Sequence, residues 1–166
     1  MGTSSGKNTP EIRRVVTVRE RSDLVPVVAR WLWDEWRRED GYSLEETVAK
    51  VGKRTSPLGP EQCFVLLVNG APVATASLTQ CDLPARLDLK PWLAEVFVKP
   101  KFRRRGFGSQ LVGCVEAACR SAEIPTIWLF TASAADLYSR LGWHAVGIEA
   151  FHGTDVILMR RDLGRS

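Results

Sequence analysis

Two apolar segments joined by Asn69-Gly70 constrain the fold of this chain most strongly. Residues 62–68 and 72–79 are rich in apolar and β-branched side chains, which favour β-strands. An Asn-Gly pair between such segments favours the tight two-residue turn of a β-hairpin. The pattern therefore predicts two adjacent antiparallel strands near the middle of the chain.

Further strands and helices are predicted on both sides of this hairpin. The remaining strands are expected over residues 13–19, 92–98, 126–131, 143–148 and 155–160. Helices are expected from residue 24 and over residues 43–51, 108–122 and 134–141, with Ser43 capping the second. Because strands alternate with helices in the second half, the order predicts an α/β or mixed α+β sheet covered on both faces.

Length and composition fit one globular domain. The 166 residues are 45% hydrophobic and 25% charged, values close to those of ordinary soluble domains, which excludes wholesale disorder and a long coiled coil. A chain of this length can bury a core of its own. We expect a single domain over residues 11–166, preceded by a flexible polar segment, residues 1–10.

Cysteine and apolar usage favour the cytoplasm. Cys63 and Cys114 lie in apolar stretches, as buried thiols do in a reducing compartment. No apolar run reaches about 18 residues and the N-terminus has no signal-peptide core, so we expect no membrane partner. The four cysteines form no C-x-x-C pair and only two histidines accompany them, so no metal site is expected.

The clearest chemical signal lies between an expected strand and an expected helix. The net charge is only +4, yet five cations fall close together at Lys99, Lys101, Arg103, Arg104 and Arg105. Gly106 and Gly108 allow the backbone to turn its N–H groups toward one ligand, and the following helix adds its positive N-terminal end. This segment predicts a binding site for phosphate groups.

The same segment resembles the GNAT N-acetyltransferase superfamily. Arg103-x-x-Gly106-x-Gly108 follows a strand, as the family's pyrophosphate-binding signature does. Glu95-Val96-Phe97-Val98 resembles the family's splayed fourth strand, and the stretch from Leu137 to Trp143 resembles its F/L-Y-x-x-x-G-F/W element. The resemblance implies a GNAT fold, with a central mixed, mostly antiparallel sheet of six to seven strands and about four helices.

The resemblance also implies an activity and a set of acetyl-CoA contacts. The activity is transfer of the acetyl group of acetyl-CoA to a primary amine, on a small molecule or a peptide, by direct attack in a ternary complex. The expected cofactor-binding residues are Val96, Phe97, Val98, Arg103, Arg104, Arg105, Gly106, Phe107, Gly108, Ser109 and Thr131. Thr131 departs from the family pattern, since many members carry Asn there, and a hydroxyl makes fewer hydrogen bonds than an amide.

Three groups are candidates for the chemical step. The backbone N–H of Val96 or Phe97 would stabilise the oxyanion, and Tyr138 would protonate the departing thiolate. The alternative for Tyr138 is a ring that only packs against the helix expected over residues 108–122. Glu95 lies among apolar neighbours, which predicts a raised pKa and a role as base toward the ammonium. The alternative for Glu95 is an ordinary carboxylate paired with a nearby arginine.

Other interpretations stay open at this point. His144 and His152 are further candidates for the base. Trp31, Trp33 and Trp36 are typical of a core, although some of these rings could line the acceptor site. A non-catalytic acyl-CoA sensor would fit the same motifs. A nucleic-acid-binding module using residues 99–105 fits less well, because few aromatic residues accompany the cations, so no nucleic acid partner is expected. A homodimer is common in the family, but the sequence shows no interface.

Overall fold

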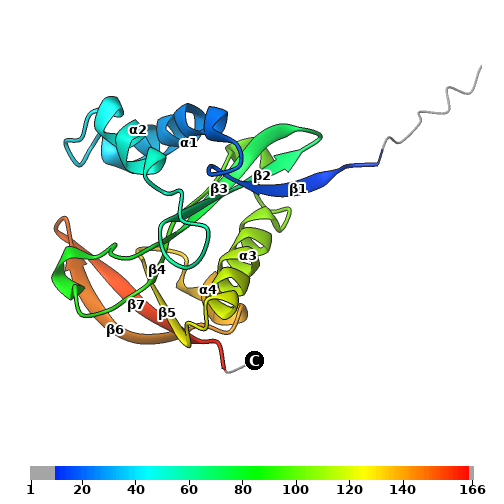
Figure 1. The fold of residues 1–166 in the computed structure, drawn as a ribbon. Helices are drawn as coiled ribbons and strands as arrows, with labels where there is room; N and C mark the ends of the chain where they lie inside the picture. Colours follow the sequence, from blue (N-terminus) through cyan, green and yellow to red (C-terminus); the bar gives the residue numbers. More distant parts are fainter. Residues whose placement is uncertain (1–9, 165–166) are drawn as a thin grey trace, which may run out of the picture.

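A seven-stranded sheet runs through the computed structural model, which describes residues 10–164. The strands are β1 (Arg13–Thr17), β2 (Gln62–Val68), β3 (Ala71–Thr79), β4 (Trp92–Val98), β5 (Thr126–Thr131), β6 (His144–Phe151) and β7 (Thr154–Asp162). Their order is β1-β2-β3-β4-β5-β7-β6, and β4 with β5 is the parallel pair among otherwise antiparallel neighbours. The predicted mixed, mostly antiparallel sheet is confirmed (Figure 1).

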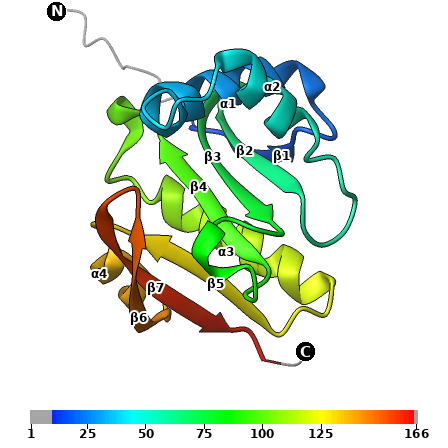
Figure 2. The same cartoon turned by 90° about the vertical axis from the view of Figure 1, so that its left-hand side faces the viewer.

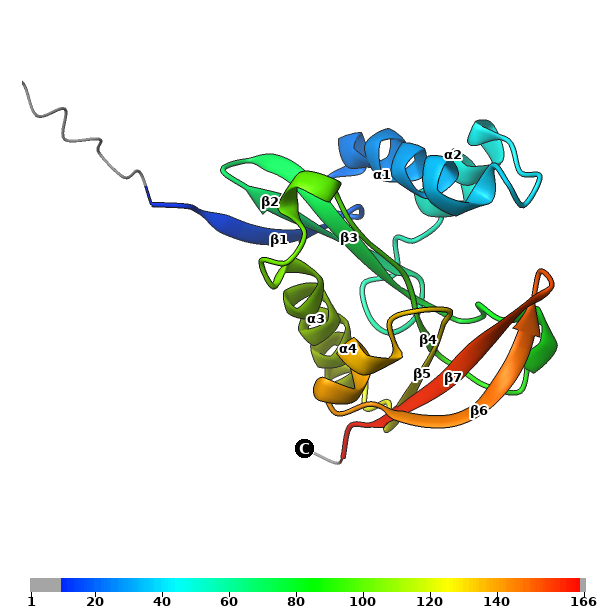
Figure 3. The same ribbon diagram turned by 180° about the vertical axis from the view of Figure 1, so that it is seen from behind.

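Four α-helices cover the two faces of this sheet. They are α1 (Val25–Leu32), α2 (Leu44–Gly52), α3 (Phe107–Ser121) and α4 (Ala135–Arg140). Helices α1 and α2 lie on one face, whereas α3 and α4 lie on the other, as the view from behind shows (Figure 3). Each pair packs over its own apolar cluster, so the prediction of a sheet covered on both faces is confirmed. None of the helices within residues 10–164 is long and apolar enough to cross a bilayer.

The central hairpin forms where the Asn-Gly pair predicts it. Strands β2 and β3 are antiparallel, and Val68 pairs with Ala71 across the turn. Asn69 and Gly70 have φ angles of 50° and 83°, a combination that suits the right-handed twist of the two strands. This hairpin places β3 next to β4, the strand on which the site is built.

Helix α1 ends in a π-helical turn, Trp33–Arg37, which the sequence pattern did not reveal. The wider turn rotates the residues that follow away from the regular apolar face of α1. Trp33 consequently donates a hydrogen bond to the carbonyl of Tyr42 at 2.9 Å, while Trp36 reaches the ring of Phe97. Trp31 also contacts Phe97, with ring centroids 5.6 Å apart, so two of the three indoles share one partner while Trp33 has another.

Element ends differ from the predicted ones mainly at exposed positions. Strand β1 ends two residues early, whereas β6 and β7 form a hairpin longer than predicted. Most side chains of β6 are exposed, so the apolar alternation that marks a half-buried strand is missing there. Ser43 caps α2 as predicted, accepting the Glu46 N–H at 3.0 Å. The predicted flexible segment, residues 1–10, lies outside the described residues except for Pro10.

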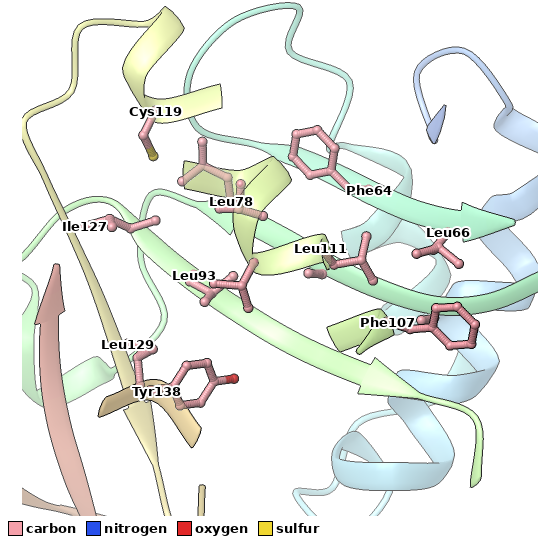
Figure 4. Packing of buried hydrophobic residues seen from close by; sticks show 14 of the residues in the cluster. Phe64, Leu66, Leu78, Leu93, Phe107, Leu111, Cys119, Ile127, Leu129 and Tyr138 are labelled. Carbon is pink, nitrogen blue, oxygen red and sulfur yellow. The ribbon is translucent and has the colours of Figure 1, made fainter. Parts of the chain in front are cut away.

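Leu111 anchors α3 to the sheet and provides a test of this packing. Its side chain is fully buried in the cluster that α3 shares with Phe64, Leu78 and Leu93 (Figure 4). Leu111→Ala should lower the free energy of unfolding by about 2–5 kcal/mol, because the cavity adds to the lost burial. Denaturant unfolding measures this, with the exposed Leu58→Ala as control, expected within about 0.5 kcal/mol of the natural protein. Equal losses of unfolding free energy in Leu111→Ala and Leu58→Ala would contradict the role of Leu111 in anchoring α3 to the sheet.

Candidate active site

Strands β4 and β5 lie side by side only at their beginnings. Trp92 pairs with Trp128, whose N–H donates to the Pro91 carbonyl at 3.1 Å. Beyond this point the two described strands form no further ladder and diverge (Figure 2). From Leu93 to Val98, the edge of β4 that faces β5 can therefore give its backbone hydrogen bonds to a ligand.

A β-bulge bends β4 beside this opening. Ser77 of β3 pairs with Ala94 and Thr75 pairs with Phe97, so Glu95 and Val96 together oppose a single residue of β3. Glu95 takes a φ of 55°, a left-handed conformation that is unusual for this residue type. Bulges re-aim the groups that follow them. The N–H groups predicted to hold the oxyanion, those of Val96 and Phe97, lie at this bend, and their role stays a prediction.

The predicted phosphate-binding segment joins β4 to the start of α3. Gly106 has a φ of 81° and directly precedes the helix, so a residue with a Cβ would be strained there. No side chain caps the first turn of α3. The N–H groups of Phe107, Gly108 and Ser109 thus lie at the positive end of the helix without intrahelical partners.

These elements enclose a cavity of about 340 Å³. Seven of its lining residues belong to the predicted cofactor-binding set, namely Val98, Arg103, Arg104, Gly106, Phe107, Gly108 and Ser109. Three more line it without having been predicted, namely Phe102, Leu137 and Arg140. The cavity therefore combines three arginines with the free N–H groups of a helix start, a donor set suited to phosphate oxygens.

Arg140 is the cation that sequence reasoning missed. It lies on α4 two residues after Tyr138, as does the lining residue Leu137 one residue before Tyr138, whereas the other lining residues come from β4, α3 and the loop between them. No sequence motif marks a single arginine on a short helix as a ligand-binding residue. Only the packing of α4 beside α3 brings Arg140 to the cavity (Figure 3).

Four predicted cofactor-binding residues do not line the cavity. The side chain of Arg105 pairs with Glu11 and stacks 5.0 Å from the ring centroid of Phe107. Thr131 accepts the Ala134 N–H at 3.0 Å and so helps to start α4. The other two, Val96 and Phe97, are part of β4. The contacts predicted for them would be made to acetyl-CoA by their backbone groups and not by their side chains. The Arg105 side chain thus has a structural partner that the sequence did not reveal.

Tyr138 is buried in the cluster between α3, α4 and the sheet. Its ring lies 6.1 Å from that of Trp143, and its hydroxyl oxygen is turned away from Leu129 (Figure 4). Burial raises the pKa of Tyr138 to about 12, which keeps the phenol protonated at neutral pH. The ring does pack in the α3 cluster, and its predicted role as proton donor stays a prediction.

Glu95 has an environment opposite to the predicted one. Its carboxylate accepts from Arg54 at 2.6 Å and from Lys50 at 3.1 Å. Burial alone would raise the pKa of Glu95, but the two cations outweigh it and hold the pKa at about 2. The predicted raised pKa is therefore wrong, and the alternative of an arginine-paired carboxylate is confirmed. The sequence could not reveal this, because Arg54 is 41 residues away.

Neither histidine lies in the cavity between β4 and α3. His152 is at the β6–β7 turn, with Nε2 3.6 Å from a carboxylate oxygen of Asp40, and His144 begins β6 with an exposed side chain. Within residues 10–164, no cluster of three or more histidine, cysteine or acidic side chains is placed to hold a metal ion.

Comparison with known proteins identifies the family. The model of the acetyltransferase (GNAT) domain matches residues 59–145, more than half of the chain. The chain belongs to the GNAT acetyltransferase family. A search among curated protein sequences gives no match.

Solved structures share the fold at low sequence identity. Aminoglycoside 6'-acetyltransferase type Ii superimposes with a TM-score of 0.72 at 18% identity, over 92% of this chain and 99% of that one. An aminoglycoside 6'-N-acetyltransferase complexed with coenzyme A gives 0.71 at 17% identity, over 92% and 98%. The ribosomal-protein-S18-alanine N-acetyltransferase from Escherichia coli gives 0.66 at 18% identity, over 93% and 96%. At these identities the likeness shows the fold alone.

Proposed function

We propose that this protein transfers the acetyl group of acetyl-CoA to a primary amine by direct attack within a ternary complex. The observation that carries the proposal is the cavity at the β4–α3 loop, which begins at Val98, the last residue of the strand whose edge toward β5 is unpaired beyond Trp92. One end offers cations and helix N–H groups, and the other offers unpaired backbone groups. A long ligand with phosphates at one end and an amide-containing arm at the other matches this distribution of donors.

The arginines and the helix start would hold the phosphates. Arg103, Arg104 and Arg140 line the cavity together with Gly106 and Gly108. A Cβ at Gly108 would make ordinary van der Waals contact with Val98 and Val96, so the fold does not require a glycine here, although its absence of a side chain leaves room at the cavity wall. The cavity residues thus fit the pyrophosphate of acetyl-CoA in charge and in donor type.

The groups near the bulge of β4 would serve the chemical step. The N–H of Val96 or Phe97 would stabilise the negative charge that develops on the thioester oxygen, because a fixed donor there costs no reorganisation. Tyr138, protonated at neutral pH, would give its proton to the thiolate as the C–S bond breaks. The amine must be neutral before it attacks, which requires a group that accepts its proton.

Binding and catalysis can be tested separately. Acetyl-CoA should raise the melting temperature of the protein, by an amount that grows with ligand concentration, whereas DNA and RNA should not. Thiol release should then require an added primary amine. Stabilisation by acetyl-CoA, without release of free thiol in the presence of any amine, would favour a non-catalytic acyl-CoA sensor. Stabilisation by nucleic acid alone would favour a nucleic-acid-binding module.

Arg140→Ala should weaken acetyl-CoA binding about tenfold. The change removes one charge-assisted contact to a phosphate. This loss of affinity should become smaller at higher salt concentration, because Arg140 is exposed and dissolved ions screen its charge. Titration calorimetry measures the Kd, with Arg120→Ala in the last turn of α3 as a charge-matched control expected to leave it unchanged. An unchanged Kd in Arg140→Ala would remove this residue from the site.

The acceptor is proposed to be a small molecule or a peptide with a free amine. Among proteins of the same fold, named examples act on aminoglycosides or on ribosomal protein S18. Location in the cytoplasm and formation of a homodimer both stay predictions.

A further inference from the structure

The bulge of β4 is held by an arginine side chain from outside the sheet. Glu95, the residue of the bulge with a φ of 55°, accepts a hydrogen bond from Nη1 of Arg54 at 2.6 Å. The same Nη1 donates to the hydroxyl of Ser77 at 2.9 Å. Ser77 belongs to β3 and pairs with Ala94 of β4, at the point where the register between the two strands shifts. One guanidinium nitrogen therefore bridges both strands at the bulge.

Arg54 is itself fixed in place. Its side chain is only 1% exposed, and its backbone N–H donates to the Val51 carbonyl of α2 at 3.0 Å. The next residue, Thr55, forms an isolated β-bridge with Gln62 at the start of β2. A side chain that is locked by its surroundings can hold other groups in a defined geometry. The bridge from Arg54 therefore fixes β3 and β4 relative to each other at the bulge.

The left-handed conformation of Glu95 needs contacts that hold it. A non-glycine residue in this conformation is unfavourable by itself and persists where the surrounding structure determines it. The carboxylate of Glu95 supplies such contacts, because it accepts from both Arg54 and Lys50. These two cations keep the pKa of Glu95 at about 2, so the carboxylate is charged at neutral pH. The bridge therefore persists at neutral pH.

The two residues after Glu95 carry the N–H groups predicted to hold the oxyanion. The ring of Phe97 lies 5.6 Å from that of Trp31 and 6.4 Å from that of Trp36, on the α1 side of the sheet. Val96 packs against the cluster on the opposite face. The bulge is thus held by side chains at both ends, which fixes the direction of its peptide groups. Direction matters, since a misplacement of about 1 Å at a reacting group can cost about 100-fold in rate.

We propose that Arg54 is a positioning residue for acetyl transfer, which holds the bulge so that the N–H of Val96 or Phe97 meets the thioester oxygen as negative charge develops there. The proposal rests on the function proposed above. Arg54 does not line the cavity that would hold the phosphates, so it acts through Glu95 and Ser77. Loss of the bridge should therefore lower kcat and leave the affinity for acetyl-CoA nearly unchanged, because the contact that suffers is made in the transition state.

Ser77→Ala removes one hydrogen bond of the bridge and keeps the ion pair of Arg54 with Glu95. With acetyl-CoA and the primary amine that gives the fastest thiol release, kcat should fall about tenfold. The Kd of acetyl-CoA, measured by calorimetry, should change less than about twofold. Thr79→Val is the matched control, because Thr79 lies two residues further along β3 and its buried hydroxyl has no hydrogen-bond partner among the described residues. Equal kcat in the two variants would overturn the proposal.

Two variants at Glu95 separate positioning from proton transfer. Glu95→Gln removes the charged carboxylate but keeps an oxygen that can accept from Arg54. Adding Arg54→Met to Glu95→Gln removes the bridge and leaves no buried charge unpaired. This second change should lower kcat about tenfold further. If Glu95 acted only as a proton acceptor, the two variants would have the same kcat, and Arg54 would have no positioning role. If Glu95→Gln does not fold, Ser77→Ala and its control decide the question.

Infrared spectroscopy of bound acetyl-CoA, isotope-labelled at the acetyl carbonyl, gives a readout other than activity. A hydrogen bond to the carbonyl oxygen weakens the C=O bond. The C=O stretch should therefore lie at lower frequency in the natural protein and in Thr79→Val than in Ser77→Ala. The same frequency in all three would contradict the role of Arg54 while leaving acetyl transfer intact. Absence of thiol release from the natural protein with any amine would overturn the proposed function and, with it, this role.

Discussion

Tyr138→Phe should lower turnover at least tenfold while leaving the affinity for acetyl-CoA nearly unchanged. The substitution removes only the hydroxyl, so the ring keeps its place beside Trp143 in the α3 cluster. What is lost is the proton for the departing thiolate, and a positioned acid of this kind contributes about 100-fold or more to a rate. Steady-state kinetics and calorimetric titration with acetyl-CoA measure the two quantities.

The control for this experiment is the chain's second tyrosine. Tyr42 is exposed in the connection between α1 and α2, where Arg37 stacks on its ring. Tyr42→Phe should therefore leave turnover unchanged. If Tyr138→Phe also kept full turnover, the buried ring would be explained by packing alone and Tyr138 would leave the mechanism.

Arg54→Met should lower the free energy of unfolding by about 3–5 kcal/mol, because a buried ion pair loses one member. Glu95 would keep only the half-exposed Lys50 as partner, and the Ser77 hydroxyl would lose its donor. The difference in unfolding free energy between the natural protein and Arg54→Met should become smaller as the pH falls from about 4.5 toward 2. Over that range the low pKa of Glu95 ceases to stabilise the natural protein. Denaturant unfolding at several pH values measures this.

Two further variants separate charge pairing from packing. Arg30→Met removes the exposed partner of Asp34 and should cost less than about 1 kcal/mol. Arg54→Met combined with Glu95→Gln should recover part of the loss, because no unpaired charge is left buried. A loss at Arg54 as small as that at Arg30 would show that the buried pair contributes little.

The order of the elements could be read from the sequence because most of them carry local signals. The Asn69-Gly70 turn and the Ser43 cap depend on neighbouring residues only, and both form as predicted. The π-helical turn after α1 escaped detection, since its residues keep an apolar pattern that a regular helix also explains. The two strands of the β6–β7 hairpin were predicted, but their full length was not, because most side chains of β6 are exposed and show no alternation.

Part of the candidate site was also predictable, because its residues are neighbours in the sequence. The segment from Arg103 to Ser109 is contiguous, so its glycines and cations could be assigned together, and most of them line one cavity. Arg140 comes from another part of the chain and reaches the site only through folding. The pKa of Glu95 depends on Arg54, and no local pattern reports an ion pair between such distant residues.

The central claim is that acetyl-CoA bound along β4 is consumed by an amine. The direct measurement incubates the protein with acetyl-CoA and, in turn, a polyamine, an aminoglycoside, an amino acid ester and a peptide with a free N-terminus. Mass spectrometry of the amine and titration of free thiol are followed together. The account predicts that at least one amine gains one acetyl group for each thiol released. Binding of acetyl-CoA with no acetylated amine in any mixture would contradict it.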